Sequence, residues 1–365
     1  MEGTFGGHKV SQIWLAQSAF SAIDGSLKYS PSDVWLRLGT EAVDTNKGGY
    51  TQANETVVEP LRLSALVRPW PHEIIFGVFF LVAWTRLVWA AGFFHPSSLT
   101  FLAYFLGGFG LMCWGQHRPT PMRWRVRILF FAGISTGSYL SLRDAIPAMY
   151  SHTMFKVDGL LQSMDQVLTG GHLDFLFATG DHPLLVDLFT GCYLFFFYYL
   201  IAGPAHYYFT NVNLFRKIGV GMFSLYGLGY LGYILVPAIG PHELMGAREG
   251  SFFGEVGNTF VINHSNGFDA FPSIHFGATF FLLAFDWEHY RRRFWLLLLP
   301  TLGLWVATVF LRYHYFVDLL GGLVVALVAL WITREFSRSR TDEVPIGEDS
   351  LILGAQDKDV PAAQS

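Results

Sequence analysis

Two short segments near the C-terminal end of the chain place histidines beside other polar residues in otherwise apolar sequence. In RYHYFVDLLGG, His314 and Asp318 are four positions apart, so a helix would carry both on one face. In FDAFPSIHFGATFF, Ser273 and His275 follow a proline, which is a favoured residue in the first turn of a helix. Free backbone N–H groups at such a helix start attract anions. The two segments therefore predict chemistry on an anionic group.

These residue types suit phosphoryl transfer without a metal or an organic cofactor. Asp318 can accept a hydrogen bond from Nδ1–H of His314, which leaves Nε2 able to attack phosphorus and form a phosphohistidine. His275 would protonate the leaving oxygen and later deprotonate the acceptor hydroxyl. Ser273 and backbone N–H groups would hold the non-bridging oxygens. We therefore predict His314 as the nucleophile, His275 as the acid and base, and Asp318 as the group that orients His314.

A zinc site is an alternative for the same side chains. Its ligands would be His275, His314 and Asp318 together with His264 or His242. Imidazole and carboxylate groups bind zinc, but this set lacks the compact spacing that zinc sites commonly show. We therefore expect no metal.

The composition is that of a multi-pass membrane protein. Of the 365 residues, 52% are hydrophobic and only 14% are charged, which is too apolar for a soluble chain of this length. The net charge of −4 comes without any basic stripe, so we expect no nucleic-acid partner. Cys113 and Cys192 both lie in apolar stretches and cannot form a disulfide framework. The chain is thus expected to act in a lipid bilayer.

Eight apolar stretches are long enough to cross a bilayer as helices. They lie near residues 74–94, 97–115, 127–146, 183–203, 217–238, 272–287, 294–312 and 314–333. The sixth stretch enters the membrane and the seventh returns, so His275 and His314, which are 39 positions apart, reach the same membrane face. The predicted fold class is an all-α membrane bundle of about eight transmembrane helices, six of which form the core.

Basic residues lie in alternate connections between these stretches. They are Arg118, Arg123, Arg125, Arg127, Arg216, Lys217, Arg291, Arg292, Arg293, Arg334, Arg338 and Arg340. Because cytoplasmic loops are enriched in Lys and Arg, these connections and both termini are predicted to be cytoplasmic. Residues 147–181 and 240–270 are then extracytoplasmic, and the two histidines face the outer leaflet.

The chain is predicted to comprise four parts. Residues 1–70 and the acidic tail, residues 341–365, show no sustained apolar period and are expected to be weakly ordered. Residues 71–126 would hold two accessory transmembrane helices. Residues 127–340 would form the core that carries the histidines.

One extracytoplasmic connection has a helical pattern of its own. Apolar residues recur at helical spacing in KVDGLLQSMDQVL, which begins at Lys156. We expect an amphipathic helix on the outer membrane surface. Its polar face would carry Asp158, Gln162, Asp165 and Gln166. A helix that only packs on the bundle would show the same pattern.

FPSIH followed by HYFVD resembles the second and third motifs of the type 2 phosphatidic acid phosphatase superfamily, which read PSGH and HxxxD. FDAFPSIHFGATFF and WVATVFLRYHYFVDLLGG resemble the inositol phosphorylceramide synthase branch in particular, and YILVPAIGPHELM is similar to the loop that precedes these motifs there. The resemblance covers roughly residues 127–335. It implies the same roles for His275, His314 and Asp318 as the chemistry above.

Two charged positions of these motifs are missing. The first motif, a Lys and an Arg-Pro pair six residues apart, has no counterpart on the predicted outer face, and the arginine of the third motif is Thr308 here. Another arginine must then balance the phosphate charge. We favour Arg248 and Arg312 as phosphate-binding residues over Arg143, because Arg143 can pair with the adjacent Asp144.

The predicted activity is that of a membrane lipid phosphatase or phosphotransferase. Water and a lipid alcohol can both accept the group from a phosphohistidine, so the histidines do not separate a hydrolase from a transferase. The predicted partners are a phospholipid donor and, as acceptor, ceramide, diacylglycerol or water. Transfer of a phosphoinositol-type head group to ceramide is the most specific version. A non-catalytic transporter or scaffold that retains the fold is the alternative, and the oligomeric state stays open.

Single cysteines test the predicted orientation. Lys156→Cys lies in a connection predicted to be extracytoplasmic, and Arg292→Cys lies in one predicted to be cytoplasmic. In intact cells an impermeant thiol reagent should label Lys156→Cys and spare Arg292→Cys, because the bilayer separates them. The background is measured on a chain in which both native cysteines are replaced. The reverse labelling pattern would put the histidines on the cytoplasmic side.

Overall fold

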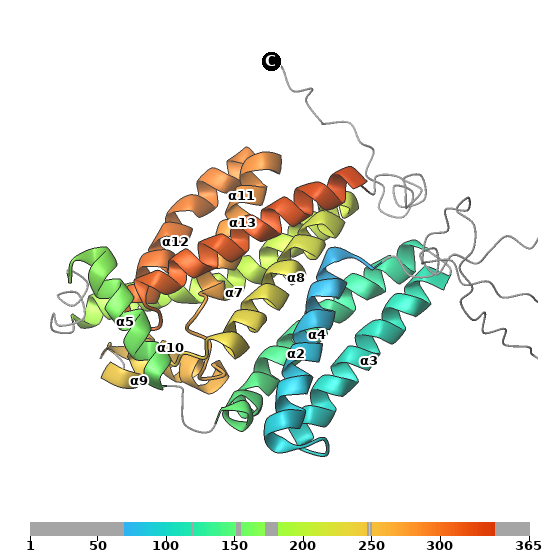
Figure 1. Cartoon of the computed structure of the whole chain (residues 1–365). Helices are drawn as coiled ribbons and strands as arrows, with labels where there is room; N and C mark the ends of the chain where they lie inside the picture. The colour runs from blue at the N-terminus through green and yellow to red at the C-terminus, as the bar shows by residue number, and fades with distance from the viewer. Residues whose placement is uncertain are drawn as a thin grey trace, which may run out of the picture. The chain divides into compact units, whose positions relative to one another are not determined.

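The computed structural model describes residues 69–117, 120–150, 155–171, 182–246, 248 and 250–339 (Figure 1). The chain divides into two units, residues 1–65 and 66–365, and all described residues belong to the second. Weak order is predicted for residues 1–70 and 341–365, and all of these except residues 69 and 70 lie outside the described residues.

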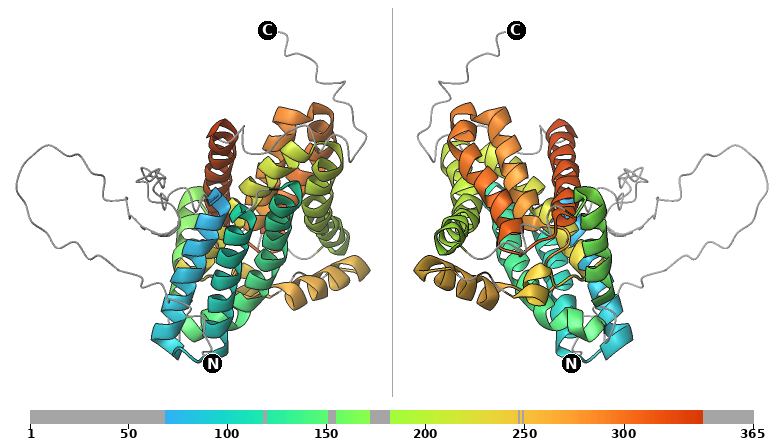
Figure 2. Two further views of the ribbon diagram at one scale, coloured as in Figure 1. Left: turned by 90° about the vertical axis from the view of Figure 1, so that its right-hand side faces the viewer. Right: turned by 90° about the vertical axis from the view of Figure 1, so that its left-hand side faces the viewer.

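The described part of the chain is all helical, as predicted. Its helices are α2 (Pro71–Ala91), α3 (Pro96–His117), α4 (Pro121–Met149), α5 (Phe155–Thr169), α7 (Pro183–Thr210), α8 (Val212–Leu235), α9 (Pro241–Met245), α10 (Phe252–His264), α11 (Ile274–His289), α12 (Arg291–Phe310) and α13 (Phe316–Ser339). An isolated bridge joins Ala238 to Asp269. Figure 2 shows the same helices from two further sides.

Each of the eight predicted apolar stretches corresponds to a helix. Six of these helices are long and apolar enough to cross a membrane, namely α2, α3, α7, α8, α12 and α13. The chain is therefore a multi-pass membrane protein. Helix α11 has only 16 residues, and α4 is more polar, with several arginines in its first two turns. The count of eight spans stays a prediction.

Helix α4 begins earlier than predicted. Pro121 starts it, and the hydroxyl of Thr120 accepts a hydrogen bond from the N–H of Arg123. Arg127 therefore lies inside the helix, where its guanidinium donates two hydrogen bonds to Glu73 of α2, at 2.8 and 2.6 Å. Both side chains are buried, and a paired guanidinium and carboxylate satisfy each other there. This pair joins α4 to α2.

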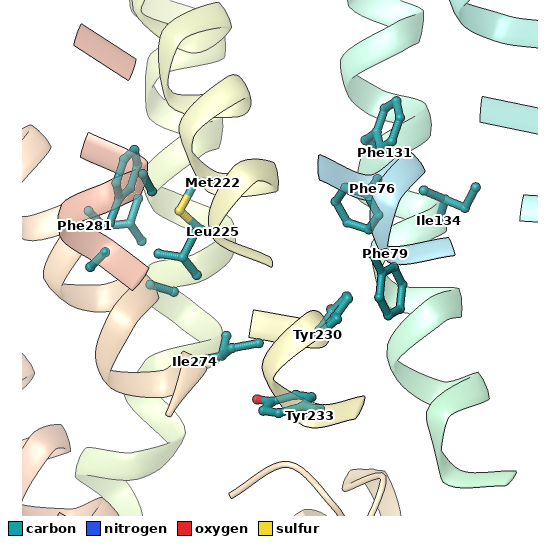
Figure 3. Close-up of a cluster of buried hydrophobic side chains, with 14 of the residues drawn as sticks. Phe76, Phe79, Phe131, Ile134, Met222, Leu225, Tyr230, Tyr233, Ile274 and Phe281 are labelled. Atoms are coloured by element: carbon teal, nitrogen blue, oxygen red, sulfur yellow. The ribbon is translucent and has the colours of Figure 1, made fainter. Parts of the chain in front are cut away.

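Helix α8 lies at the centre of the bundle. It packs against α2 and α4 on one side, against α11 and α13 on another, and against α7. Figure 3 shows Met222 and Leu225 of α8 near Phe281 of α11, and Tyr230 of α8 near Phe76 of α2. The large buried rings make the apolar core continuous from the accessory helices to the helices that carry the histidines.

Two glycines let α11 and α13 approach closely. A Cβ atom on Gly277 would lie 2.9 Å from the carbonyl oxygen of Gly322, and one on Gly322 would clash with the carbonyl oxygen of Ser273. Helices that meet at glycines can pack with their backbones nearly in contact. The contact brings the first turn of α11 beside the first turn of α13, where the N–H of Ser273 donates to the carbonyl of Asp318 at 2.9 Å.

Helix α5 forms where the amphipathic pattern predicts it, but the expected polar face is not a solvated one. Asp158 and Asp165 are 1% and 4% exposed, whereas Val167 is 84% exposed and Leu160 is 61% exposed. The two carboxylates turn inward because they accept hydrogen bonds from backbone N–H groups. Those of Ile239 and Gly240 donate to Asp158. Leu160, Met164, Val167 and Leu168 are left exposed, whereas Leu161 is buried.

Asp165 caps helix α13 from another helix. Its two carboxylate oxygens each accept a hydrogen bond of 2.7 Å, from the N–H groups of Phe316 and Val317 (Figure 1 shows α5 beside the start of α13). The first N–H groups of a helix have no partner within the helix, so a carboxylate at this place satisfies two of them and also favours the positive end of the helix dipole.

Loss of this cap should loosen the start of α13. Asp165→Ala should lower the free energy of unfolding by about 1–2 kcal/mol, in the range of a lost helix cap. It should also speed hydrogen exchange at the amides of Phe316 and Val317. Gln166→Ala, at an exposed position of the same helix, is the matched control. Unchanged exchange at both amides would show that α13 does not depend on α5.

Candidate active site

The turn that carries His314 is set by the end of helix α12. The N–H of Tyr313 donates to the carbonyl of Thr308, and the N–H of Arg312 donates to that of Val309, both at 3.0 Å. These two bonds form a Schellman motif, which needs a left-handed residue after the helix. Arg312 takes that conformation with φ of 65°, where glycine is the usual residue. The chain therefore reverses within five residues between α12 and α13.

The ring of His314 is held by a backbone carbonyl. Its Nδ1 lies 2.8 Å from the carbonyl oxygen of Ala270, so Nδ1 carries the hydrogen and Nε2 is the acceptor nitrogen. The Ala270 segment is fixed in turn, because its own N–H donates to the carbonyl of Ala238 at 3.2 Å. His314 is 2% exposed. The tautomer that a nucleophile requires is thus assigned by Ala270.

Asp318 lies beside His314 but does not accept its hydrogen. The distance from Oδ2 of Asp318 to Nδ1 of His314 is 3.6 Å, whereas the same oxygen accepts the N–H of Tyr315 at 2.7 Å. This differs from the predicted hydrogen bond, because the carbonyl of Ala270 already occupies the direction of Nδ1–H. Asp318 is fully buried, and its Oδ1 has no hydrogen-bond partner among the described side chains and backbone groups. Its contact with the imidazole is electrostatic.

His275 faces His314 across the site. Its Nδ1 lies 3.3 Å from Nε2 of His314, so the two imidazoles of the predicted pair share a hydrogen bond. Its Nε2 lies 2.8 Å from the hydroxyl of Tyr193, on α7. The ring of Phe196 lies 4.4 Å from that of His275, between centroids, and limits its movement. The prediction that His275 and His314 lie close together is confirmed by the distance between their rings.

Tyr193 is a site residue that the sequence did not point to. It lies in the aromatic run YLFFFYYL of α7, where nothing in the pattern separates it from residues that only pack. Its ring also lies 4.7 Å from that of Tyr313, the neighbour of His314. One tyrosine therefore contacts both motifs.

Ser273 caps helix α11. Its hydroxyl accepts a hydrogen bond from the N–H of Phe276 at 3.3 Å, and its side chain is fully buried. The cap fixes the start of the helix within one turn of His275. Phosphate binding by Ser273 stays a prediction.

The candidate arginines lie near the site and contact backbone groups. Arg248 is 1% exposed, and its Nε donates to the carbonyl of Phe310 at 2.8 Å. Arg312 donates to the carbonyls of Met245 and Gly246 at 3.3 and 3.2 Å. Both therefore tie the segment after α9 to the turn before His314. Arg143 is exposed on α4, away from these contacts.

A cavity of about 830 Å³ opens beside the two histidines. Its walls come mainly from α4, α7 and α8, and most of their lining side chains are aliphatic or aromatic. Its polar end is formed by His242, His264, Asp269, His275 and His314. Burial lowers the pKa of His242, the adjacent Glu243 opposes this shift, and Arg312 adds to it. Ser273, Arg248 and Arg312 are not among the described residues that line the cavity.

No group of three or more His, Cys, Asp or Glu side chains is arranged to hold a metal ion in the part of the chain that the structure describes. The rings of His275 and His314 bind each other, and Asp318 accepts a backbone N–H. The donor set of the alternative zinc site is therefore not assembled in this arrangement.

Comparison with known proteins agrees with the motifs. Residues 160–332 match the PAP2 superfamily. The chain is also similar to the inositol phosphorylceramide synthase of Candida albicans, with 28% identity over 197 residues that cover 48% of this chain and 41% of the relative. The chain thus spans less than half the length of that curated relative, and no solved structure matches it significantly.

The PAP2 region coincides with the helices that build the site. It starts within α5 and ends within α13, so it contains His275, His314 and Asp318 and also Tyr193. Helices α2, α3 and α4 precede it. The resemblance predicted from FPSIH and HYFVD is confirmed. The match begins at residue 160 rather than near residue 127, so α4 and the first turn of α5 lie outside it.

The hydroxyl of Tyr193 should matter for turnover. Tyr193→Phe removes the hydrogen bond to His275 and keeps the ring that packs on it, so catalysis should fall by about 10- to 100-fold, as expected for a bond to a group that becomes charged. Steady-state rates on lipid phosphoesters measure this. Tyr198→Phe, exposed on the same helix, should leave the rate unchanged. Equal rates for both variants would remove Tyr193 from the site.

Proposed function

We propose that this protein is a lipid phosphatase or phosphotransferase that works through a phosphohistidine on His314. The observation that carries the proposal is the pair of facing imidazoles, with an Nδ1 to Nε2 distance of 3.3 Å, at the polar end of an apolar cavity. The match of residues 160–332 to the PAP2 superfamily and the similarity to an inositol phosphorylceramide synthase support it.

In the first half-reaction the lone pair on Nε2 of His314 forms a bond to phosphorus, and the bond from phosphorus to the lipid oxygen of the donor breaks. The leaving oxygen takes a proton from His275. The phosphate must first separate the two imidazoles, since Nε2 of His314 and Nδ1 of His275 share a hydrogen bond. Tyr193 remains bound to the far nitrogen of His275 and keeps its ring in place.

In the second half-reaction an acceptor hydroxyl gives its proton to His275 and its oxygen bonds to phosphorus. The N–P bond breaks, and the electron pair returns to Nε2 of His314. The same residue therefore acts as acid and then as base. Water as acceptor completes a hydrolysis, and a lipid alcohol completes a transfer.

Asp318 stabilises the charge that His314 acquires. When Nε2 is bonded to phosphorus, the ring with its Nδ1–H is positive, and the carboxylate 3.6 Å away lowers the energy of that state. The Ala270 carbonyl meanwhile accepts Nδ1–H in both states. Asp318 thus acts by its charge, and Ala270 supplies the orientation.

The non-bridging oxygens need positive partners. The N–H groups in the first turn of α11 lie next to His275, and a helix start favours an anion. Arg248 and Arg312 contribute positive charge from the segments that flank the turn, and they are our candidates for the missing arginine of the motif. Backbone carbonyls hold both of them close to the turn that carries His314.

The cavity favours a lipid alcohol as acceptor, and we place the reaction at the outer leaflet because of the predicted topology. Lining residues of α8 extend from Phe215 to Tyr233, which is about 27 Å along a helix, close to the roughly 30 Å thickness of a bilayer core. An apolar channel of that length suits a lipid chain whose hydroxyl end reaches the histidines. Transfer of a phosphoinositol-type head group to ceramide is the version that the similar Candida protein suggests by its name.

Trapping the intermediate tests the proposal. With a donor labelled in its phosphate, acid-labile, base-stable label should be found on His314 after the reaction is stopped, and thin-layer analysis with ceramide, diacylglycerol or water should show which product forms. His314→Ala should abolish label and turnover, and His275→Ala should slow both half-reactions. Asp318→Asn should reduce turnover by up to about 10⁴-fold, as when the carboxylate partner of a catalytic imidazole is neutralised.

Controls separate loss of chemistry from loss of fold. His95→Ala, in the turn between α2 and α3, lies outside the PAP2 region and should label as the parent does. Thermal unfolding of each variant checks its fold. EDTA should leave turnover unchanged. If EDTA abolished turnover and added zinc restored it, the alternative metal site would be favoured. Substantial turnover by a folded His314→Ala variant would overturn the nucleophile, and absence of any product would favour a non-catalytic transporter or scaffold.

A further inference from the structure

We propose that Asp269 determines acceptor specificity by accepting a hydrogen bond from a second donor group of the acceptor lipid, beside the hydroxyl that reacts. The inference rests on the proposed function and adds a residue that neither the motifs nor the superfamily match singles out. It assigns Asp269 to recognition, and leaves the bond-making steps to His275 and His314.

Asp269 is placed next to the catalytic pair by the backbone. It precedes Ala270, whose carbonyl holds Nδ1 of His314, and consecutive Cα atoms are about 3.8 Å apart. Its own backbone forms the bridge to Ala238. Asp269 lines the same cavity as His275 and His314. A ligand that reaches the histidines from the apolar channel therefore passes its carboxylate.

The carboxylate of Asp269 is partly satisfied. Its Oδ2 accepts a short hydrogen bond from the hydroxyl of Tyr139, on α4, and its Oδ1 accepts one of 3.0 Å from Ser265. An ionised carboxylate has about four acceptor positions, so each oxygen can take another donor. No Lys or Arg of the described segments forms an ion pair with it. Its charge is held by neutral hydroxyls at the edge of an apolar cavity, and such a group gains from each further donor.

The two hydroxyls also fix the direction of the carboxylate. Tyr139 comes from α4 and Ser265 from the residue after α10, so Asp269 is held from two sides. A preorganised acceptor loses little freedom when a ligand binds, and it discriminates sharply between ligands with and without the matching donor. This arrangement suits a specificity position.

The other carboxylate of the cavity is a weaker candidate. Glu243 has a 53% exposed side chain and lies 3.8 Å from Nδ1 of His242. Water competes for an exposed carboxylate, so a ligand donor gains little there. Asp269 is less exposed and lies beside the anchor of His314.

The predicted acceptor lipids differ in whether they carry a second hydrogen-bond donor that Asp269 could bind. Ceramide carries an amide N–H and a second hydroxyl besides the hydroxyl that reacts, whereas diacylglycerol carries only the reacting hydroxyl. Asp269 therefore favours an acceptor of the ceramide class over diacylglycerol. The amide and the second hydroxyl are two sources of the same donor chemistry, and analogues that lack one or the other separate them.

Binding measurements test this without any turnover. Purified protein in lipid nanodiscs binds a fluorescent ceramide, and unlabelled ceramide, its N-methyl analogue, its 3-deoxy analogue and diacylglycerol compete for it. Ceramide should compete about 10- to 100-fold more strongly than diacylglycerol and than the analogue that lacks the contacting donor, as for a hydrogen bond to a charged group. Asp269→Asn and Asp269→Ala should reduce that ratio at least several-fold. Asp144→Asn, an exposed carboxylate on α4, is the matched control and should keep the ratio of the parent.

The outcomes are separable from those of the phosphohistidine experiment. Equal competition by all four lipids in the parent protein would overturn the role of Asp269, and so would an unchanged ratio in folded Asp269 variants. Loss of labelling of His314 in Asp269→Asn would place Asp269 in the donor step instead and would also overturn it. A parent protein that discriminates among the lipids but forms no phosphohistidine would retain the recognition role and reject the proposed chemistry.

Discussion

The hydrogen bond from Nδ1 of His314 to the carbonyl of Ala270 is the contact on which the rest of the site depends. It selects the tautomer, orients Nε2 toward His275, and leaves the carboxylate of Asp318 able to act through its charge. A backbone carbonyl can do this only if its peptide cannot turn. The bond from Ala270 to Ala238 and that from Ser273 to Asp318 hold the segment on both sides of the carbonyl. Helix α5 holds the neighbours of this segment, because its Asp158 accepts a hydrogen bond from the N–H of Gly240 and its Asp165 caps α13. Gly240 has φ of 84° and approaches the carbonyl of Tyr313 closely, which excludes a side chain there. Helix α5 therefore supports the turn through its two buried carboxylates, while it leaves apolar side chains such as Leu160 and Val167 exposed.

The helices and the meeting of the two histidines could be predicted because both follow from local pattern and connectivity. Apolar stretches of bilayer length give the spans, and the hairpin of α11 and α12 returns His314 to the level of His275. The partners of the histidines could not be predicted. Tyr193 contacts His275 across 82 positions from within an aromatic run, and the Ala270 carbonyl is a backbone group that no side-chain motif records.

Acidic residues are where the sequence pattern and the structure differ most, for one physical reason. An Asp in an amphipathic helix usually faces water, so the pattern predicts a solvated polar face for α5 and pairs Asp318 with the nearest imidazole. In the structure these carboxylates instead accept hydrogen bonds from backbone N–H groups at the starts of helices and turns. The residues are Asp158, Asp165 and Asp318. Such N–H groups lack partners in every helical bundle, and sequence pattern does not show where they will lie.

The two candidate arginines bind backbone carbonyls, just as the buried carboxylates bind backbone N–H groups. Arg312 and Arg248 donate to carbonyls at the ends of short segments, where helices leave acceptors without partners, and they join the residues after α9 to the end of α12. Two positive charges are thereby fixed beside the histidine turn by contacts that are structural in themselves. In the third motif of the superfamily, an arginine at the position of Thr308 would lie on α12 and would supply the positive charge from that helix alone. Here Thr308 occupies that position and its carbonyl closes the turn, and Arg248 and Arg312 of the flanking segments are our candidates for the charge.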